Sequence, residues 1–281
     1  MGAYKIIINA DDFGRHTLIN QAVAKGVKEG ILRSATLMPG GKAFDEAVEI
    51  GRTHSALGVG IHFTLVNGFP ILPPEEIPSL VTKEGVFLDD YNLFVKHFLA
   101  GRVRMEEVRR ELAAQAAKME KTGLALTHVD SHQHMHVLPG VIDAVLHTAE
   151  SLSIDAVRIP RTPLFEGGIG SAGQLIGRLG LWSLAQMAAL KAKKRHFRTP
   201  RHFEGIVAGR AVSPEHLLHI ARHLAPGTTE VMMHPGLAND TLIPACRWDH
   251  DFEAEMAAIL SPKVKAALQG KGADIVNFRD L

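Results

Sequence analysis

The fold of this chain is indicated first by the stretch Thr127-His128-Val129-Asp130-Ser131-His132-Gln133-His134-Met135-His136. It continues a short apolar run, and we predict one β-strand from Leu124 to His136. In an extended chain alternate side chains share a side, so His132, His134 and His136 would lie together. Imidazoles at this density indicate a metal site, a proton-transfer network or both. The alternative is a polar loop with solvated histidines.

Strand-like and helix-like segments alternate along the rest of the chain. The other expected strands are Ile6–Ile8, Ile31–Met38, Leu57–Leu65, Ala156–Pro160, Phe203–Val207, Thr229–Gly236 and Ala273–Phe278. The expected helices are Thr17–Glu29, Ala43–Arg52, Tyr91–Leu99, Met105–Gly123, Val141–Ser151, Leu175–Leu190 and Pro214–Leu224. This order predicts a single α/β domain over residues 1–281, a TIM-like barrel with about seven parallel strands that is imperfectly closed.

The composition sets broad limits on function. Of 281 residues, 46% are hydrophobic and 22% charged, which is typical of a soluble globular protein. The net charge of +1 gives no field that would favour nucleic acid as a partner. The single cysteine, Cys246, excludes an internal disulfide and fits a reducing compartment. Because the N-terminus enters a strand-like run at once, and no apolar run approaches the ~20 residues of a membrane span, we expect a cytoplasmic protein.

Chemically useful side chains stand where the expected strands end. Asp11 and Asp12 follow the first strand, His62 lies late in the third, and His234 ends a later one. In a barrel these positions and His132 converge on the C-terminal face. Simpler interpretations are a helix cap for one aspartate and a satisfied core position for His62.

Together these residues favour metal-assisted hydrolysis. One carboxylate and two imidazoles with open coordination positions describe a catalytic divalent site. A second carboxylate could accept a proton from the attacking water, and His234 could protonate a leaving group. No serine nucleophile elbow is present, and Cys246 lies in a loop-like stretch without an evident partner.

Two further features stand outside this pattern. Arg158 lies within an apolar strand, which favours an anionic partner or a polar substrate group over an unpaired cation, with a plain salt bridge as the alternative.

The segment 165–203 is expected to be an inserted helical and basic segment. Its run Gly168–Gly173 fits a dinucleotide-binding pattern but lacks the preceding strand, so we reject that function. Residues 175–198, an apolar helix and a basic tail, would contact a membrane surface or an apolar substrate, or form a core helix with a solvated end.

Four motifs in order resemble the YdjC-like carbohydrate deacetylases, a family that includes the chitooligosaccharide deacetylases. They are Asn9-Ala10-Asp11-Asp12-Phe13-Gly14, Gly60-Ile61-His62-Phe63, Thr127-His128-Val129-Asp130-Ser131-His132-Gln133-His134 and His234-Pro235-Gly236. The inserted segment and Val157–Arg161 are most similar to the hopanoid-biosynthesis-associated members. The resemblance implies removal of acetyl from an N-acetylated sugar, either an N-acetylglucosaminyl hopanoid or a chitooligosaccharide, with release of acetate.

Residue by residue, the resemblance makes Asp12, His62 and His132 the metal ligands, Asp11 the general base and His234 the general acid. The roles of Asp11 and Asp12 are open to exchange. The metal of the family is magnesium, whereas the ligand types suit zinc as well. Other polar side chains would hold a ligand in orientation or contact the substrate. These are Asp130, His134, His136 and Arg158.

Other functions and assemblies remain open at this point. A phosphodiesterase would share the ligands but should have more cationic residues around them. A sugar- or metal-binding protein without activity would have little use for two adjacent aspartates. A glycolipid substrate would bring peripheral contact with the inner face of a membrane, and a homodimer is compatible with the sequence.

Overall fold

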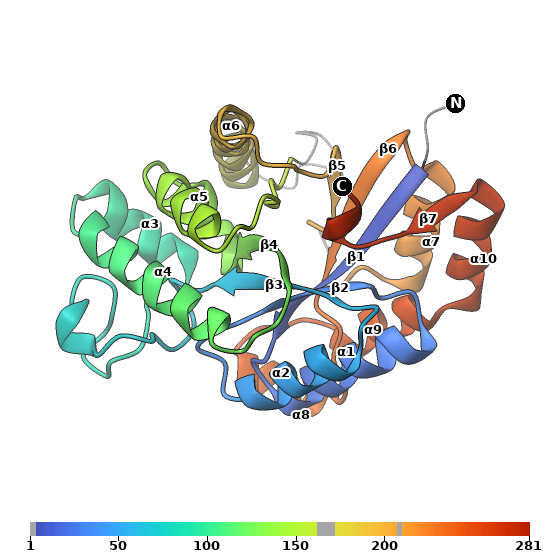
Figure 1. Cartoon of the computed structure of the whole chain (residues 1–281), viewed down its shortest axis with the longest axis horizontal. Helices are drawn as coiled ribbons and strands as arrows, with labels where there is room; N and C mark the ends of the chain where they lie inside the picture. Colours follow the sequence, from blue (N-terminus) through green and yellow to red (C-terminus); the bar gives the residue numbers. More distant parts are fainter. Residues whose placement is uncertain (1–3, 162–171, 207–209) are drawn as a thin grey trace.

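A parallel β-sheet curved into an incomplete barrel forms the centre of the molecule, and helices cover it on the outside (Figure 1). A computed structural model describes residues 4–161, 172–206 and 210–281. The strands are β1 (Tyr4–Phe13), β2 (Ser34–Leu37), β3 (Gly58–Phe63), β4 (Leu126–Ser131), β5 (His202–Glu204), β6 (Gly227–Met233) and β7 (Ala273–Ile275). Their order is β4-β3-β2-β1-β6-β5, and β7 pairs in parallel with the first residues of β1.

Isolated bridges continue the sheet beyond β4. Val157 pairs with Val129 of β4, and Ala156 pairs with Arg198, just before β5. The predicted strand Ala156–Pro160 is therefore present only as bridges in the described residues. The prediction of an imperfect TIM-like barrel is confirmed.

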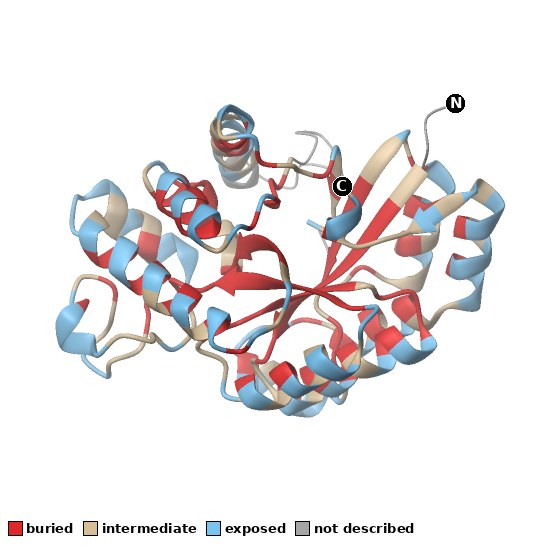
Figure 2. Ribbon diagram, viewed as in Figure 1, coloured by how far each residue is buried: buried red, intermediate tan, exposed pale blue. Residues whose placement is uncertain are grey.

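The described helices surround this sheet. They are α1 (Thr17–Glu29), α2 (Phe44–Thr53), α3 (Tyr91–Leu99), α4 (Met105–Glu120), α5 (Val141–Ser151), α6 (Ala172–Lys194), α7 (Pro214–His223), α8 (Asn239–Cys246), α9 (Phe252–Leu260) and α10 (Pro262–Lys271). The strands β1 to β4 are almost wholly buried, whereas the helices expose their outer faces (Figure 2). Strands covered on both sides require continuous apolar runs such as Ile6–Ile8, and these residues have no exposed surface.

The histidine-rich stretch departs from the predicted strand. β4 ends at Ser131, and residues His132–Val137 form a 3₁₀ turn, η2. Gln133 and His134 adopt left-handed backbone angles, with φ of 51° and 58°. The Ser131 hydroxyl accepts a hydrogen bond from the His136 backbone N–H at 2.8 Å, which holds the turn. His132, His134 and His136 therefore do not share one side of a strand.

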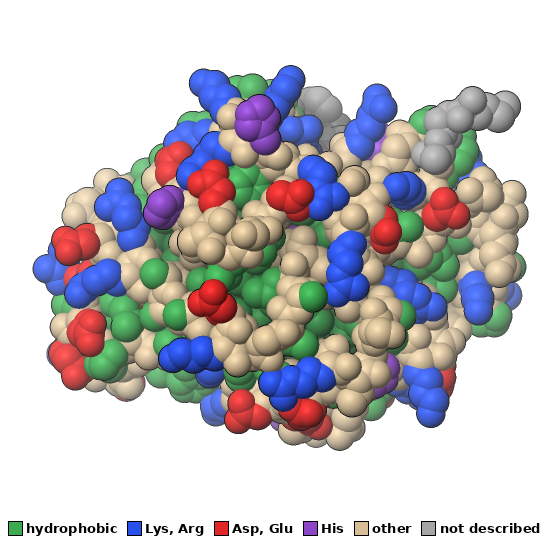
Figure 3. Space-filling view, in the orientation of Figure 1, with side chains coloured by type: hydrophobic (Ala, Val, Ile, Leu, Met, Phe, Trp, Pro, Cys, Tyr) green, Lys and Arg blue, Asp and Glu red, His purple; other side chains and the backbone are tan. Residues whose placement is uncertain are grey.

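Only part of the predicted insertion belongs to the described residues, since residues 162–171 fall outside them. Helix α6 is longer than predicted, and Lys and Arg side chains gather over it (Figure 3). Lys191 pairs with Asp143 and Arg195 with Glu150, both on α5, so the basic run serves partly to hold α6 on the barrel. None of the described helices combines the length and apolar character needed to cross a membrane.

Candidate active site

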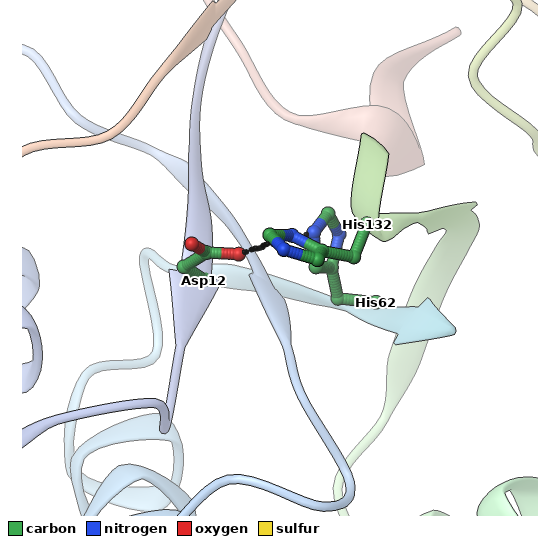
Figure 4. A group of neighbouring side chains, drawn as sticks. All are labelled: Asp12, His62 and His132. Carbon is green, nitrogen blue, oxygen red and sulfur yellow. Dashed lines mark ion pairs between the residues drawn. The ribbon is translucent and has the colours of Figure 1, made fainter. Parts of the chain in front are cut away.

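The C-terminal ends of four strands carry the predicted site residues. Asp11 and Asp12 lie near the end of β1, His62 lies near the end of β3, His132 follows β4, and His234 follows β6. These strand ends lie at one end of the barrel because the strands are parallel. Figure 4 shows the side chains of Asp12, His62 and His132 pointing toward one another.

A bulge in β1 brings two adjacent carboxylates to the same place. The pairing of β1 with β2 shifts between Ala10 and Phe13, and Asp12 has a φ of 61°. In a regular strand Asp11 and Asp12 would point to opposite faces. Here His62 Nε2 lies 3.4 Å from Asp12 Oδ1 and 4.0 Å from Asp11 Oδ2. The left-handed backbone costs about 1–2 kcal/mol, which is typical of strain at a functional site.

Asp12, His62 and His132 form a donor set that fits a divalent cation. His132 Nδ1 lies 2.9 Å and His62 Nε2 3.4 Å from Asp12 Oδ1. Neighbouring ligand atoms around tetrahedral zinc lie about 3.3 Å apart. Asp12 Oδ1 and His62 Nε2 are buried without a hydrogen-bond partner among the described residues. Because unpaired buried polar atoms are costly, a cation that binds all three groups would satisfy them.

Neighbouring side chains fix the orientation of these donors. Asp130 Oδ1 lies 2.7 Å from His62 Nδ1, which leaves Nε2 of that ring directed at Asp12. Arg15 Nη1 donates to Asp12 Oδ2 at 2.7 Å and lies 3.4 Å from His132 Nε2. The sequence interpretation missed Arg15, although its place directly after the Asp11–Gly14 motif was an available signal.

Arg158 is buried against three carboxylates. Its Nη1 and Nη2 each donate to Asp11 at 2.6 Å, and its Nε donates to Glu230 at the same distance. Nη1 also lies 2.5 Å from Asp130 Oδ2. The side chain has no exposed surface. These contacts give Arg158 anionic protein partners, and two of its nitrogens bind Asp11.

These contacts set the charge of the site. Burial alone would raise the pKa of Asp12 and of Asp11. The positive charges of His132 and Arg15 hold the pKa of Asp12 well below its usual range, and Arg158 lowers that of Asp11. Burial opposes the protonated form of His62, but the carboxylates around it raise its pKa to about 10. Both aspartates are thus ionised at neutral pH.

Glu230, which the sequence interpretation also missed, provides a test of this network through pH. Burial raises its pKa to about 7, although Arg158 opposes this. A raised pKa in the folded state stabilises the protein at low pH, and this contribution is lost as pH rises through about 7.

We expect the unfolding free energy of the natural protein, relative to Glu230→Gln, to fall by on the order of 1–3 kcal/mol between pH 5 and pH 8. Urea unfolding at each pH measures this, with Glu120→Gln on the exposed end of α4 as the matched control. An equal pH profile for the natural protein and Glu230→Gln would contradict it.

The other histidines of the stretch lie apart from the three donors. His136 contacts Ser131 Oγ through Nδ1 at 2.7 Å and the Arg158 carbonyl through Nε2 at 2.9 Å. It therefore links the end of β4 to the segment that contains Val157 and Arg158. His134 stands edge-on to Phe203, and its buried Nδ1 has no hydrogen-bond partner in the part of the chain that the structure describes. His128 stacks on Phe278 with ring centroids 3.5 Å apart and is part of the core.

A pocket of about 200 Å³ opens beside Arg15. It is also lined by Lys42, Phe69 and Arg247, with Cys246 at the end of α8. Cys246 is therefore helical, where a loop was expected. Burial raises the pKa of its thiol to about 11, so it is protonated at neutral pH and is a poor nucleophile.

Comparison with known proteins identifies the family. The model of the YdjC-like protein family matches residues 5–270. The chain belongs to the YdjC-like family.

Relatives of this YdjC-like chain match it over nearly their whole length. A carbohydrate deacetylase of Brevibacillus brevis is 29% identical over 99% of both chains. One of Mus musculus is 32% identical and covers 99% of this chain and 94% of its own. A crystal structure from Enterococcus faecalis, described as a candidate for cellobiose-phosphate cleavage, has a TM-score of 0.75 at 26% identity and covers 99% of this chain and 98% of its own.

His234 directly follows β6 and belongs to a group of its own within this YdjC-like barrel. Its backbone N–H donates to Glu255, and its ring stands edge-on to those of Trp248 and His250. Burial lowers the pKa of His234, and the carboxylates of Asp11 and Glu255 partly offset this. Glu255 and His250 were missed by the sequence interpretation, because they lie on α9 and in the loop before it, away from any strand end.

Proposed function

We propose that this YdjC-like protein is a divalent-metal-dependent hydrolase that removes acetyl from an N-acetylated sugar and releases acetate. The observation that carries the proposal is the buried set Asp12, His62 and His132 beside the ionised carboxylate of Asp11. Two ligand atoms of this set have no hydrogen-bond partner among the residues that the structure describes. The names of the relatives support the same reaction class.

In this proposal Asp12, His62 and His132 hold one divalent cation, magnesium or zinc. When bound, the cation would polarise the acetamide carbonyl and stabilise negative charge on its oxygen. Asp11 accepts the proton of the attacking water, and Arg158 keeps Asp11 ionised and fixed in place. His234 donates a proton to the sugar nitrogen as the C–N bond breaks.

The pocket beside Arg15 is the proposed position of the sugar. Phe69 is 42% exposed and offers an apolar face for a sugar ring. Lys42 Nζ lies over the Phe69 ring, 5.0 Å from its centroid. Arg15 joins this pocket to the donor set through its bond to Asp12. A chitooligosaccharide is therefore the soluble substrate that we propose to test first.

Metal removal tests the cation requirement. After treatment with a chelator and dialysis, we expect acetate release from chitobiose to fall about 1000-fold or more, since a catalytic cation supplies several kcal/mol. Adding back magnesium, zinc, cobalt or manganese should restore it and identifies the preferred metal. Undiminished acetate release by protein shown to be metal-free would contradict the proposal.

A phosphodiesterase is the second candidate, and the basic residues of the pocket favour it. Arg247, however, is paired with Asp89 at 3.0 Å, and Arg15 with Asp12, so much of this charge is already neutralised. Phosphate release from a sugar phosphodiester without acetate release from chitobiose would favour this candidate over deacetylation.

A glycolipid substrate, such as an N-acetylglucosaminyl hopanoid, is the finer proposal for α6. Leu179, Trp182 and Leu190 are 42%, 39% and 63% exposed, and such side chains suit contact with a lipid. We expect faster acetate release from the glycolipid in anionic vesicles than from chitobiose, and a loss of this preference in Trp182→Ala. Equal rates on both substrates would contradict the role of α6 and leave deacetylation itself intact.

A further inference from the structure

A second group of side chains that could hold a metal ion lies at the C-terminal end of β6. It consists of His234, directly after β6, His250, in the loop after α8, and Glu255, on α9. One ligand atom from each of these residues lies within 4.8 Å of the others. His250 and Glu255 are buried, and His234 is half-buried.

The second group repeats the geometry of the first. His250 Nε2 lies 3.4 Å from Glu255 Oε1, the same separation as between His62 Nε2 and Asp12 Oδ1. The rings of His234 and His250 are edge-on, with centroids 5.3 Å apart and planes at 75°. The corresponding values for His62 and His132 are 5.6 Å and 68°. Ligand atoms around one tetrahedral zinc ion would be about 3.3 Å apart.

An unpaired nitrogen points into this group. His250 is 3% exposed, and its Nε2 has no hydrogen-bond partner among the described residues, although Glu255 Oε1 is near. The ring is held by stacking on Trp248, with centroids 4.0 Å apart, and by edge contact with Phe252. An imidazole this fixed, with its nitrogen unused, fits a role as a ligand.

Backbone groups orient the carboxylate. Glu255 Oε1 accepts a hydrogen bond from the Val212 N–H at 2.8 Å, and Oε2 accepts one from the His234 N–H. A carboxylate oxygen has a second lone pair, so each can still bind a cation while it accepts a backbone proton. Such hydrogen bonds are the support that metal-binding carboxylates require.

From this geometry we propose that His234, His250 and Glu255 form a second divalent-cation site that takes zinc. Two imidazoles and one carboxylate suit zinc and leave a fourth position open, whereas magnesium prefers oxygen ligands. Because His234 is also the proton donor of the proposed function, zinc at this site removes that donor. Zinc in excess therefore inhibits the deacetylase; this consequence rests on the proposed function, whereas the site itself does not.

Zinc content tests the site without any turnover. The natural protein, His250→Phe and His132→Ala are each equilibrated with zinc, freed of unbound metal and analysed for zinc per chain. We expect two zinc ions in the natural protein and one in each variant. His250→Phe keeps an aromatic ring between Trp248 and Phe252. If His250→Phe does not fold, His234→Gln replaces it in the experiment, because the position of His234 is only half-buried.

The pattern of losses decides the result. A first site that fails to bind zinc would leave one ion in the natural protein and in His132→Ala, and none in His250→Phe, so the second site stands although the proposed function is weakened. Equal zinc content in the natural protein, His250→Phe and His234→Gln overturns the proposal. It would mean that His250 only positions His234.

The inhibition is measured on the active protein. Since a positioned general acid contributes about 10²–10⁴-fold, saturating zinc should slow acetate release by the natural protein by roughly 100-fold. His250→Phe should lose this sensitivity, whatever its rate in the absence of excess zinc. Equal sensitivity to excess zinc in both proteins overturns the inhibitory role.

Discussion

Replacing His132 by alanine is expected to reduce acetate release by about 1000-fold or more and to remove the cation from the Asp12 site. His132 Nδ1 is one of three atoms that face one another there, at 2.9 Å from Asp12 Oδ1. Without it, Asp12 and His62 alone would have to hold the ion, and two ligands leave it too weakly bound and oriented. The residue lies in the turn η2, beyond the end of β4, so the barrel should retain its fold.

Metal content, acetate release and far-UV circular dichroism together measure this outcome. The matched control is His147→Ala, an exposed histidine on α5 that should change none of the three. Full activity of His132→Ala protein that has been shown to be free of metal would refute the proposed site.

Replacing Arg158 by methionine is expected to destabilise the protein by about 3–5 kcal/mol. The substitution leaves Asp11, Asp130 and Glu230 buried together without the cation that they share. Methionine fills much of the same space, so the loss measures the unpaired charge more than a cavity. Urea unfolding at pH 8, where most of this charge is present, gives the difference.

The control for shape and charge is Arg158→Lys. Lysine restores one positive charge but lacks the planar fork that reaches Asp11 with two nitrogens, so we expect an intermediate loss of stability. Acetate release by Arg158→Lys should be lower than that of the natural protein, because Asp11 would no longer be held in one orientation. A loss below about 1 kcal/mol for Arg158→Met would show that the three carboxylates do not depend on this charge.

Local patterns predicted the helices well where packing agrees with the sequence. Tyr91–Leu99 and Val141–Ser151 have the predicted bounds, because their apolar residues repeat with a helical period and turn residues flank them. The alternation of strands and helices was sufficient to predict the barrel. The pairing beyond β4 could not be predicted from the sequence, because Val157 pairs with Val129 and Ala156 with Arg198 only as single bridges.

The sequence by itself determined which residue types stand at the strand ends, and parallel strands bring such ends together whatever the details of packing. Only the tertiary structure decided their geometry. The bulge at Asp12 turns two adjacent carboxylates toward His62, and the turn after Ser131 separates His132 from His134 and His136. The partners of Arg158 and His234 come from segments that are distant in the chain, Glu230 and Glu255 among them. Such contacts depend on side-chain packing across the whole barrel, which no local pattern records.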